Sequence, residues 1–196
     1  MRAWSVMLAL LLATAACAQV QWDPAPAAYQ LSPDGAIEIS DGGGSTPDQY
    51  LLSAQDFRDF SLEFDLIARP AGGAKLRAIV VWAVQADKRE NRQAYFLPLD
   101  TVKVGEKVHF RLLVLGGRSL LYRDGQLIGT GPTVYGEPPA RGRVGFLHYY
   151  NHNVRYEHVT LQPLDPTTLA SPTKLQAAVT KGGSVRLTWE MAAEYA

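Results

Sequence analysis

The 196-residue chain contains one cysteine and has no excess of either charge. A single cysteine excludes a disulfide within the chain and a zinc site built from several thiolates. Nineteen Lys and Arg residues balance nineteen Asp and Glu residues, and no basic run is present that could neutralise a phosphate backbone. We therefore expect no nucleic-acid partner.

Long apolar runs are also lacking. A transmembrane helix needs about 20 apolar residues, and no run in the sequence is that long. The longest run, residues 6–13, is followed by small residues ending at Ala18. This pattern predicts a secretory signal peptide over 1–18 and an extracytoplasmic protein, secreted or periplasmic. Cleavage after Ala18 would remove Cys17. The alternative is a lipoprotein with a lipidated Cys17, although Thr14 stands where that signal prefers leucine.

Helical periodicity is absent after this segment, since apolar residues recur at every second position between Gly and Pro breaks. In DFRDFSLEFDLIARP, Leu62, Phe64 and Leu66 alternate with Glu63 and Asp65. This alternation predicts a strand with one core face and one solvent face. The pattern along the chain predicts an all-β protein, arranged as a two-sheet antiparallel sandwich.

Other stretches place further strands and turns. KLRAIVVWAVQ is apolar on both faces, which is typical of a central strand with Trp82 in the core, and QAYFLPLD is its expected partner. The pairs Gly116-Gly117 and Asp124-Gly125 each separate two apolar strands, and Asp-Gly favours a two-residue hairpin turn. GRVGFLHYY and VRYEHVTLQPL are expected as the last two strands of the sandwich.

The order of these strands resembles the concanavalin A-like, laminin-G-like jelly roll over about residues 30–165, and is most similar to the bacterial 3-keto-disaccharide hydrolase-type domains. The shared motifs are the alternating strand, the Asp-Gly hairpin and a Gly-x-Val-Gly-Phe strand, none of which is catalytic. The resemblance implies a jelly-roll sandwich that acts on or binds sugars. The connection QADKRENRQ is shorter than the insertion that helps to build a sugar pocket in that branch.

The composition changes near the C-terminus. We expect residues 19–165 to form the jelly roll, 166–172 to be a linker, and 173–196 to be an incomplete fibronectin type III domain. The last segment resembles the first two strands of such a domain, with Trp189 in the position of its buried tryptophan. A complete sandwich of this kind needs about 100 residues. The jelly roll is therefore expected to neighbour other domains of a longer chain.

Five residues are candidates for a sugar site. Glu63 and Asp65 project from one strand face and could serve as acid and base in glycoside chemistry, although a plain solvent-facing strand is the competing interpretation. His148 and Tyr150 follow Val144 and Phe146 at every second position of their strand, so their side chains are expected on the same face. Both could therefore reach a cleft at the strand's end. Tyr95 and Tyr150 could stack on a sugar ring.

Metal and cofactor motifs are not found. The sequence lacks an H-E-x-x-H motif, an EF-hand-like aspartate pattern and a Gly-x-Ser-x-Gly elbow. We predict no cofactor and no transition-metal site, and leave open a Ca²⁺ ion bound by loop carboxylates and carbonyls.

These features favour an exported carbohydrate-binding, lectin-like module of a larger secreted protein, with a glycan as its partner. One alternative is a hydrolase of 3-keto-glycosides, in which Glu63, Asp65 and His148 would be catalytic. A second alternative is a structural or protein-interaction sandwich. Convergence of Glu63, Asp65 and His148 on one cleft would favour catalysis, whereas their separation would favour binding or architecture.

Overall fold

The computed structural model describes residues 20–39, 49–69, 78–85, 87–148 and 154–165, together with the backbone of 173–179 and 185–190. All the regular elements in this described part are strands, which confirms the predicted all-β class. The strands of the sandwich are β1 (Tyr29–Leu31), β2 (Ile37–Ile39), β3 (Gln49–Leu52), β4 (Phe60–Ala68), β5 (Ile79–Val84), β6 (Arg92–Phe96), β7 (Lys107–Leu115), β8 (Arg118–Arg123), β9 (Gln126–Gly129), β10 (Thr133–Tyr135), β11 (Arg143–His148) and β12 (Val154–Pro163).

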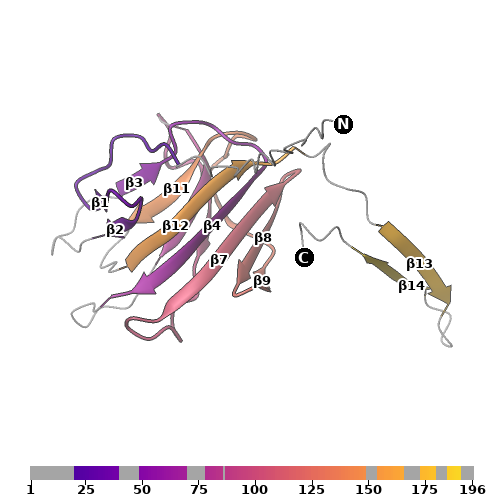
Figure 1. Ribbon diagram of the computed structural model, residues 1–196. Coiled ribbons are helices and arrows are strands. Elements are labelled where there is room, and N and C mark those ends of the chain that lie inside the picture. Colours follow the sequence, from indigo (N-terminus) through magenta and orange to yellow (C-terminus); the bar gives the residue numbers. More distant parts are fainter. Residues whose placement is uncertain are drawn as a thin grey trace, which may run out of the picture.

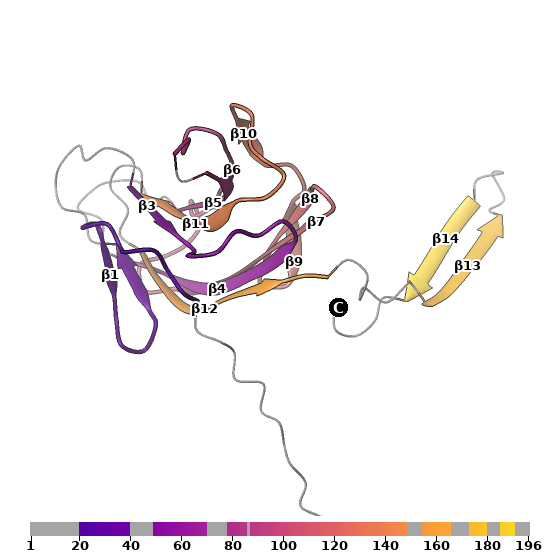
Figure 2. The same cartoon turned by 90° about the horizontal axis from the view of Figure 1, so that it is seen from above.

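These strands form two antiparallel sheets. The seven-stranded sheet has the order β1-β2-β12-β4-β7-β8-β9, and the five-stranded sheet has the order β10-β6-β5-β11-β3. Figure 1 looks onto the seven-stranded sheet, and Figure 2 shows the five-stranded sheet lying behind it as a second layer. The predicted jelly-roll sandwich is therefore confirmed.

The core lies between the two sheets, where the inward side chains of the alternating strands meet. Leu62, Phe64 and Leu66 of β4 are all buried there, as the alternation predicts. Phe146 of β11 and Tyr156 of β12 stack across the sandwich with ring centroids 4.1 Å apart, and the Phe64 ring meets both edge-on. Aromatic contacts between the sheets therefore fix their relative position.

Strand β5 is buried along its whole length, which confirms that it is a central strand. Val80 and Trp82 belong to the core between the sheets, whereas Ile79 and Val81 belong to a second apolar cluster on the other face of the five-stranded sheet. This sheet is therefore covered on both faces at β5.

Both predicted hairpins are present. Gly116 and Gly117 join β7 to β8 with φ angles of 56° and 77°, and Asp124 and Gly125 join β8 to β9 with φ angles of 47° and 78°. Two successive positive φ angles are the requirement of a type I′ turn, which Asp-Gly meets at low cost.

The C-terminal strands β13 (Thr173–Val179) and β14 (Val185–Glu190) pair with each other in a separate two-stranded sheet. They occupy the segments in which the sequence predicts two strands, and the fibronectin type III assignment stays a prediction. Residues 1–19, which include the expected signal peptide over 1–18, lie outside the described residues. Within the described part, no helix is long and apolar enough to cross a membrane.

Candidate functional site

Glu63 and Asp65 lie on the outer face of β4, and both are engaged in ion pairs. Glu63 Oε1 is 3.0 Å from Arg111 Nε on the neighbouring strand β7. Asp65 accepts hydrogen bonds from two histidines, because its two oxygens lie 2.9 Å from His109 Nδ1 and 2.9 Å from His158 Nδ1. The paired carboxylates predicted from the sequence therefore face the same side but bind neighbouring side chains.

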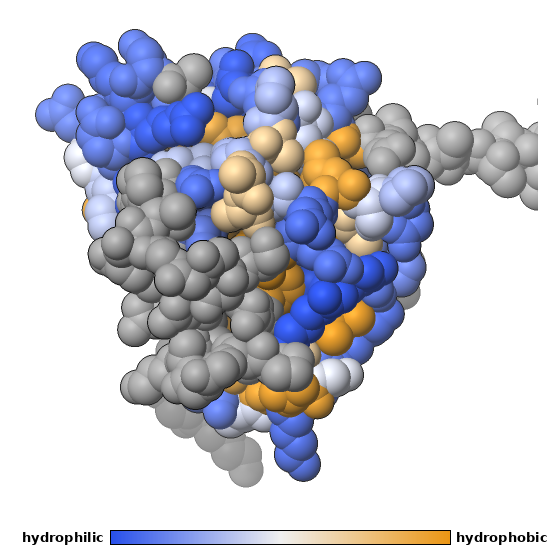
Figure 3. Space-filling model, turned by 90° about the vertical axis from the view of Figure 1, so that its left-hand side faces the viewer, coloured by the Kyte–Doolittle hydropathy of each residue, from blue (hydrophilic) through white to orange (hydrophobic). Residues whose placement is uncertain are grey.

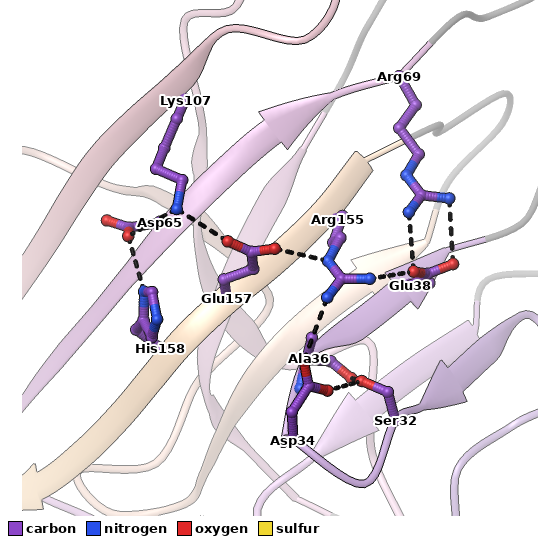
Figure 4. Close-up of polar contacts among 10 residues, drawn as sticks. All are labelled: Ser32, Asp34, Ala36, Glu38, Asp65, Arg69, Lys107, Arg155, Glu157 and His158. Carbon is purple, nitrogen blue, oxygen red and sulfur yellow. Dashed lines mark hydrogen bonds and ion pairs between the residues drawn. The ribbon is translucent and has the colours of Figure 1, made fainter.

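The same face continues as a row of alternating charges over β7, β12 and β2 (Figure 4). Lys107 Nζ contacts Glu157 at 2.8 Å, and the other oxygen of Glu157 accepts from Arg155 Nε at 2.8 Å. Arg155 also pairs with Glu38, which binds the two guanidinium nitrogens of Arg69 at 2.8 and 3.1 Å. Each carboxylate of this row has at least one cationic partner on the same face of the sheet.

The electrostatics of this face do not suit a proton donor. Burial raises the pKa of Asp65, but hydrogen bonds from His158 and His109 and the charge of Lys107 outweigh it, so that this pKa is lowered overall. The pKa of Glu157 is also lowered, first by its hydrogen bond from Lys107. A general acid needs a raised pKa, so Asp65 is an ion-pair partner rather than a proton donor.

His148 and Tyr95 lie on the core side of the five-stranded sheet. His148 is 4% exposed, and its ring meets that of Tyr29 at 6.5 Å. Tyr95 is 7% exposed, packs against Trp82 at 5.5 Å, and its hydroxyl lies 3.1 Å from Ser119 Oγ. The interior position of Trp82 confirms the sequence-based expectation.

The five candidate residues therefore do not share one face. The seven-stranded sheet lies between Asp65, on its outer side, and His148, on the core side of the other sheet, so a single ligand cannot touch both. The fifth candidate, Tyr150, lies outside the described residues. The catalytic set Glu63, Asp65 and His148 does not converge on a cleft.

A cavity of about 180 Å³ lies at one end of the sandwich. Trp82 and Gln93, cross-strand neighbours on β5 and β6, contribute from the five-stranded sheet. The Gly116-Gly117 turn contributes from the seven-stranded sheet. The remaining lining residues are Phe57, Arg58, Ala83, Val114, Pro139 and Ala140. The cavity thus combines an indole, a side-chain amide, a guanidinium group and a turn backbone.

The wall of this cavity contains a strained residue. Ala83 has a φ angle of +55°, which is unfavourable for a residue with a Cβ atom. The pairing of β5 with β11 shifts register beside it, and a Cβ atom added at Gly142 would lie 2.7 Å from the Ala83 carbonyl carbon. Bulges and strained backbones are concentrated near functional sites, and both occur here at the cavity wall.

Asp59 fixes the opposite wall. Its side chain is buried, and its Oδ1 accepts a hydrogen bond from the Gly116 backbone N–H at 2.6 Å. The turn between β7 and β8 is therefore held against the start of β4, and the cavity is bounded by anchored segments on both sides.

A second cluster, absent from the sequence-based prediction, lies on the outer face of the five-stranded sheet. The Arg92 guanidinium carbon is 4.5 Å from the centroid of the Tyr135 ring and 5.6 Å from that of Tyr50. The Arg89 guanidinium carbon lies 5.7 Å from the same Tyr50 ring, and the Tyr50 hydroxyl donates to the Arg89 carbonyl at 3.5 Å. The short connection QADKRENRQ therefore returns over this face and places two arginines on it.

The end of the sandwich near β1, β2 and β3 has a different character. In Figure 3, which faces this end, hydrophobic residues appear as separate patches between hydrophilic ones. The coloured atoms of this view offer no broad apolar surface. Among the described residues, no group of three or more His, Cys, Asp or Glu side chains is placed to hold a metal ion, and a Ca²⁺ site stays a prediction.

Comparisons with known proteins identify the fold. No family model matches the sequence, and no curated protein matches it. Among solved structures, a protein assigned as a glycosyl hydrolase from Parabacteroides distasonis is similar with a TM-score of 0.57 and 11% identity, over 74% of this chain and 94% of that chain. The carbohydrate-binding module CBM66 from Bacillus subtilis is similar with a TM-score of 0.53 and 14% identity, over 74% and 97% of the two chains.

A second Parabacteroides distasonis protein with the same assignment has a TM-score of 0.56 and 13% identity, over 74% of this chain and 89% of that chain. At these identities the likeness establishes a shared jelly-roll fold. In each case the match covers nearly the whole of the known protein, so the sandwich is the unit that they have in common.

Proposed function

We propose that the sandwich is an exported carbohydrate-binding module and that the cavity beside Trp82 is its sugar site. The observation that carries this proposal is the cavity itself, a hollow lined by an indole, an amide and a guanidinium group between anchored turns. The fold shared with a carbohydrate-binding module over 97% of that module's length supports it. The sequence-based signal peptide supports export.

The cavity's chemistry fits a sugar ring. Aromatic side chains pack against the C–H faces of sugars, and Trp82, which is 2% exposed and packed on Tyr95, contributes a small apolar part of the cavity wall. The Gln93 amide can both donate to and accept from hydroxyl groups, and Arg58, whose side chain is 70% exposed, can donate. A volume of about 180 Å³ is smaller than the roughly 300–1,000 Å³ typical of drug-sized pockets, which favours a single sugar unit.

Binding is favoured over hydrolysis because the cavity wall has no carboxylate among its described lining residues. Glycoside hydrolysis usually needs two carboxyl groups on either side of the scissile bond. The nearest candidate, Asp59, is buried and already accepts the Gly116 N–H. Glu63 and Asp65 lie on the outer face of the other sheet, in ion pairs.

A glycan array followed by calorimetry on the intact chain tests this proposal. For a neutral glycan identified on the array, Gln93→Ala should weaken binding about tenfold, the effect of losing about 1.4 kcal/mol. Arg58→Ala should weaken it to a similar or smaller extent. Lys103→Ala, an exposed substitution in the loop before β7, is the matched control and should bind as the native chain does.

Two results would overturn the proposal. If Gln93→Ala and Arg58→Ala both bind the glycan as the native chain does, and both have native circular dichroism, the cavity is not the sugar site. Turnover of a 3-keto-disaccharide by the native chain would instead establish the hydrolase alternative.

A further inference from the structure

We propose that Arg89 and Arg92, on the outer face of the five-stranded sheet, form a site for the carboxylate of an acidic sugar. The inference rests on the proposed carbohydrate-binding function for the identity of the ligand, and it adds a ligand class, glycans that contain uronic acid. The site is distinct from the cavity, because Arg92 and Gln93 are consecutive residues of β6 and project from opposite faces of the sheet.

The two guanidinium groups converge on one ring. Their carbon atoms lie 5.7 and 5.6 Å from the centroid of Tyr50, and Tyr135 supports Arg92 at 4.5 Å. Two like charges held near one ring repel each other, and cation–π contacts offset only part of this repulsion. An anion placed between the two groups would be attracted by both.

Four arginines with described side chains, Arg89, Arg92, Arg118 and Arg141, lack a carboxylate partner among the described residues, and of these Arg89 and Arg92 both lie near the Tyr50 ring. Six have a carboxylate partner, namely Arg58, Arg69, Arg111, Arg123, Arg143 and Arg155. In the described residues, no carboxylate lies within ion-pair distance of Arg89 or Arg92, although Asp87 and Glu90 occupy the same connection. The Arg92 side chain instead donates through Nη1 to the carbonyls of Arg89 and Glu90, at 3.2 and 3.5 Å.

Arg92 has one donor that is not satisfied within the described residues. Its Nε is buried and has no hydrogen-bond partner within the described part of the chain. A buried donor without an acceptor is unfavourable and calls for a specific explanation. The Arg92 guanidinium carbon lies 4.5 Å from the Tyr135 centroid, and the planar guanidinium group is suited to the two oxygens of a carboxylate.

The surrounding chemistry favours a sugar acid. The partly buried Tyr135 supplies aromatic surface beside Arg92, and a uronic acid presents both a carboxylate and a ring with apolar C–H groups. A phosphate would satisfy the charge but would leave the aromatic surface unused. A neutral glycan would use the aromatic surface but not the charges.

Calorimetry with trigalacturonate and its methyl ester tests the inference, because esterification removes the charge and leaves the sugar scaffold. The intact chain should bind the acid at least tenfold more tightly than the ester, and this preference should weaken with added salt. Arg89→Gln and Arg92→Gln should each remove most of the preference. Lys103→Gln removes one positive charge elsewhere and should preserve it. Arg92→Lys keeps the charge without the planar group and should lose part of the preference.

The outcomes separate this inference from the proposed function. Equal affinity for the acid and the ester would overturn the inference, and so would an unchanged preference for the acid in both glutamine variants. In either case, loss of neutral-glycan binding in Gln93→Ala would still uphold the cavity as a sugar site. The native chain could instead bind the acid but no neutral glycan, and Arg92→Gln could abolish that binding. This result would uphold the inference and overturn the cavity site. If the glutamine variants fail to fold, a native acid preference in folded Arg92→Lys would contradict the role of the planar guanidinium.

Discussion

Two buried tyrosines in the core should respond in opposite directions to loss of their hydroxyl groups. Tyr156 is fully buried, and its hydroxyl has no hydrogen-bond partner among the described residues. Tyr29 is also buried, but its hydroxyl donates to the Phe146 carbonyl at 2.9 Å and lies 3.2 Å from that of Gln49. Burial raises the pKa of both phenols, so each is neutral at ordinary pH.

We expect Tyr156→Phe to stabilise the protein by about 1 kcal/mol, because a buried hydroxyl without a partner costs about 1–3 kcal/mol and the ring contacts are kept. Tyr29→Phe should destabilise it by about 1 kcal/mol, the usual net value of one hydrogen bond. For a domain of this size each change corresponds to about 2–4 °C in the midpoint of thermal unfolding, with opposite signs.

Thermal and urea unfolding of the two variants and the native chain, followed by circular dichroism, measures both differences. The urea m-value should stay constant, so that the shift in midpoint reports stability alone. A Tyr156→Phe variant that is less stable than the native chain by 1 kcal/mol or more would show that its hydroxyl has an acceptor, and the reasoning about this core would be refuted.

Three further changes can be predicted. Gly145→Ala should destabilise the protein severely and lower its yield, because the new Cβ atom would lie 1.9 Å from the Leu51 carbonyl oxygen, and normal expression and melting would contradict the pairing of β11 with β3. Stability should fall as the pH drops below about 4, because Asp65 and Glu157 have lowered pKa values in the folded state and lose their ionic partners on protonation; Asp65→Asn should flatten that fall in acid titrations. Intact mass after export should show a chain that begins after Ala18, and a lipidated N-terminal cysteine would exclude this cleavage.

The strands and hairpins of the fold could be predicted because each of these elements depends on its local sequence. Leu62, Phe64 and Leu66 alternate over one strand, and the two turns at Gly116-Gly117 and Asp124-Gly125 need nothing beyond their own residues. The short strands β1 and β10 were not predicted, since three residues do not establish a period.

The candidate site could not be predicted in the same way, because it depends on which strands pair. The sequence correctly predicted that Val144, Phe146 and His148 lie on the same face of their strand. That face is the core side, so His148 is buried rather than placed in a cleft. Arg92 and Tyr50 are 42 positions apart in the chain and meet only because the β5–β6 connection returns over the sheet. Sequence spacing does not reveal such a contact.

The pairing of the first strands with the last has a consequence for how the chain can fold during synthesis. β3 pairs with residues 145–148 of β11 and β2 pairs with residues 154–156 of β12, so the N-terminal strands have no partners in these ladders until those residues have been made. A nascent chain that ends before β11 can form the hairpins of β7, β8 and β9 but cannot close either sheet. The sandwich should therefore stay open until almost all of it has left the ribosome, and then close in one late step.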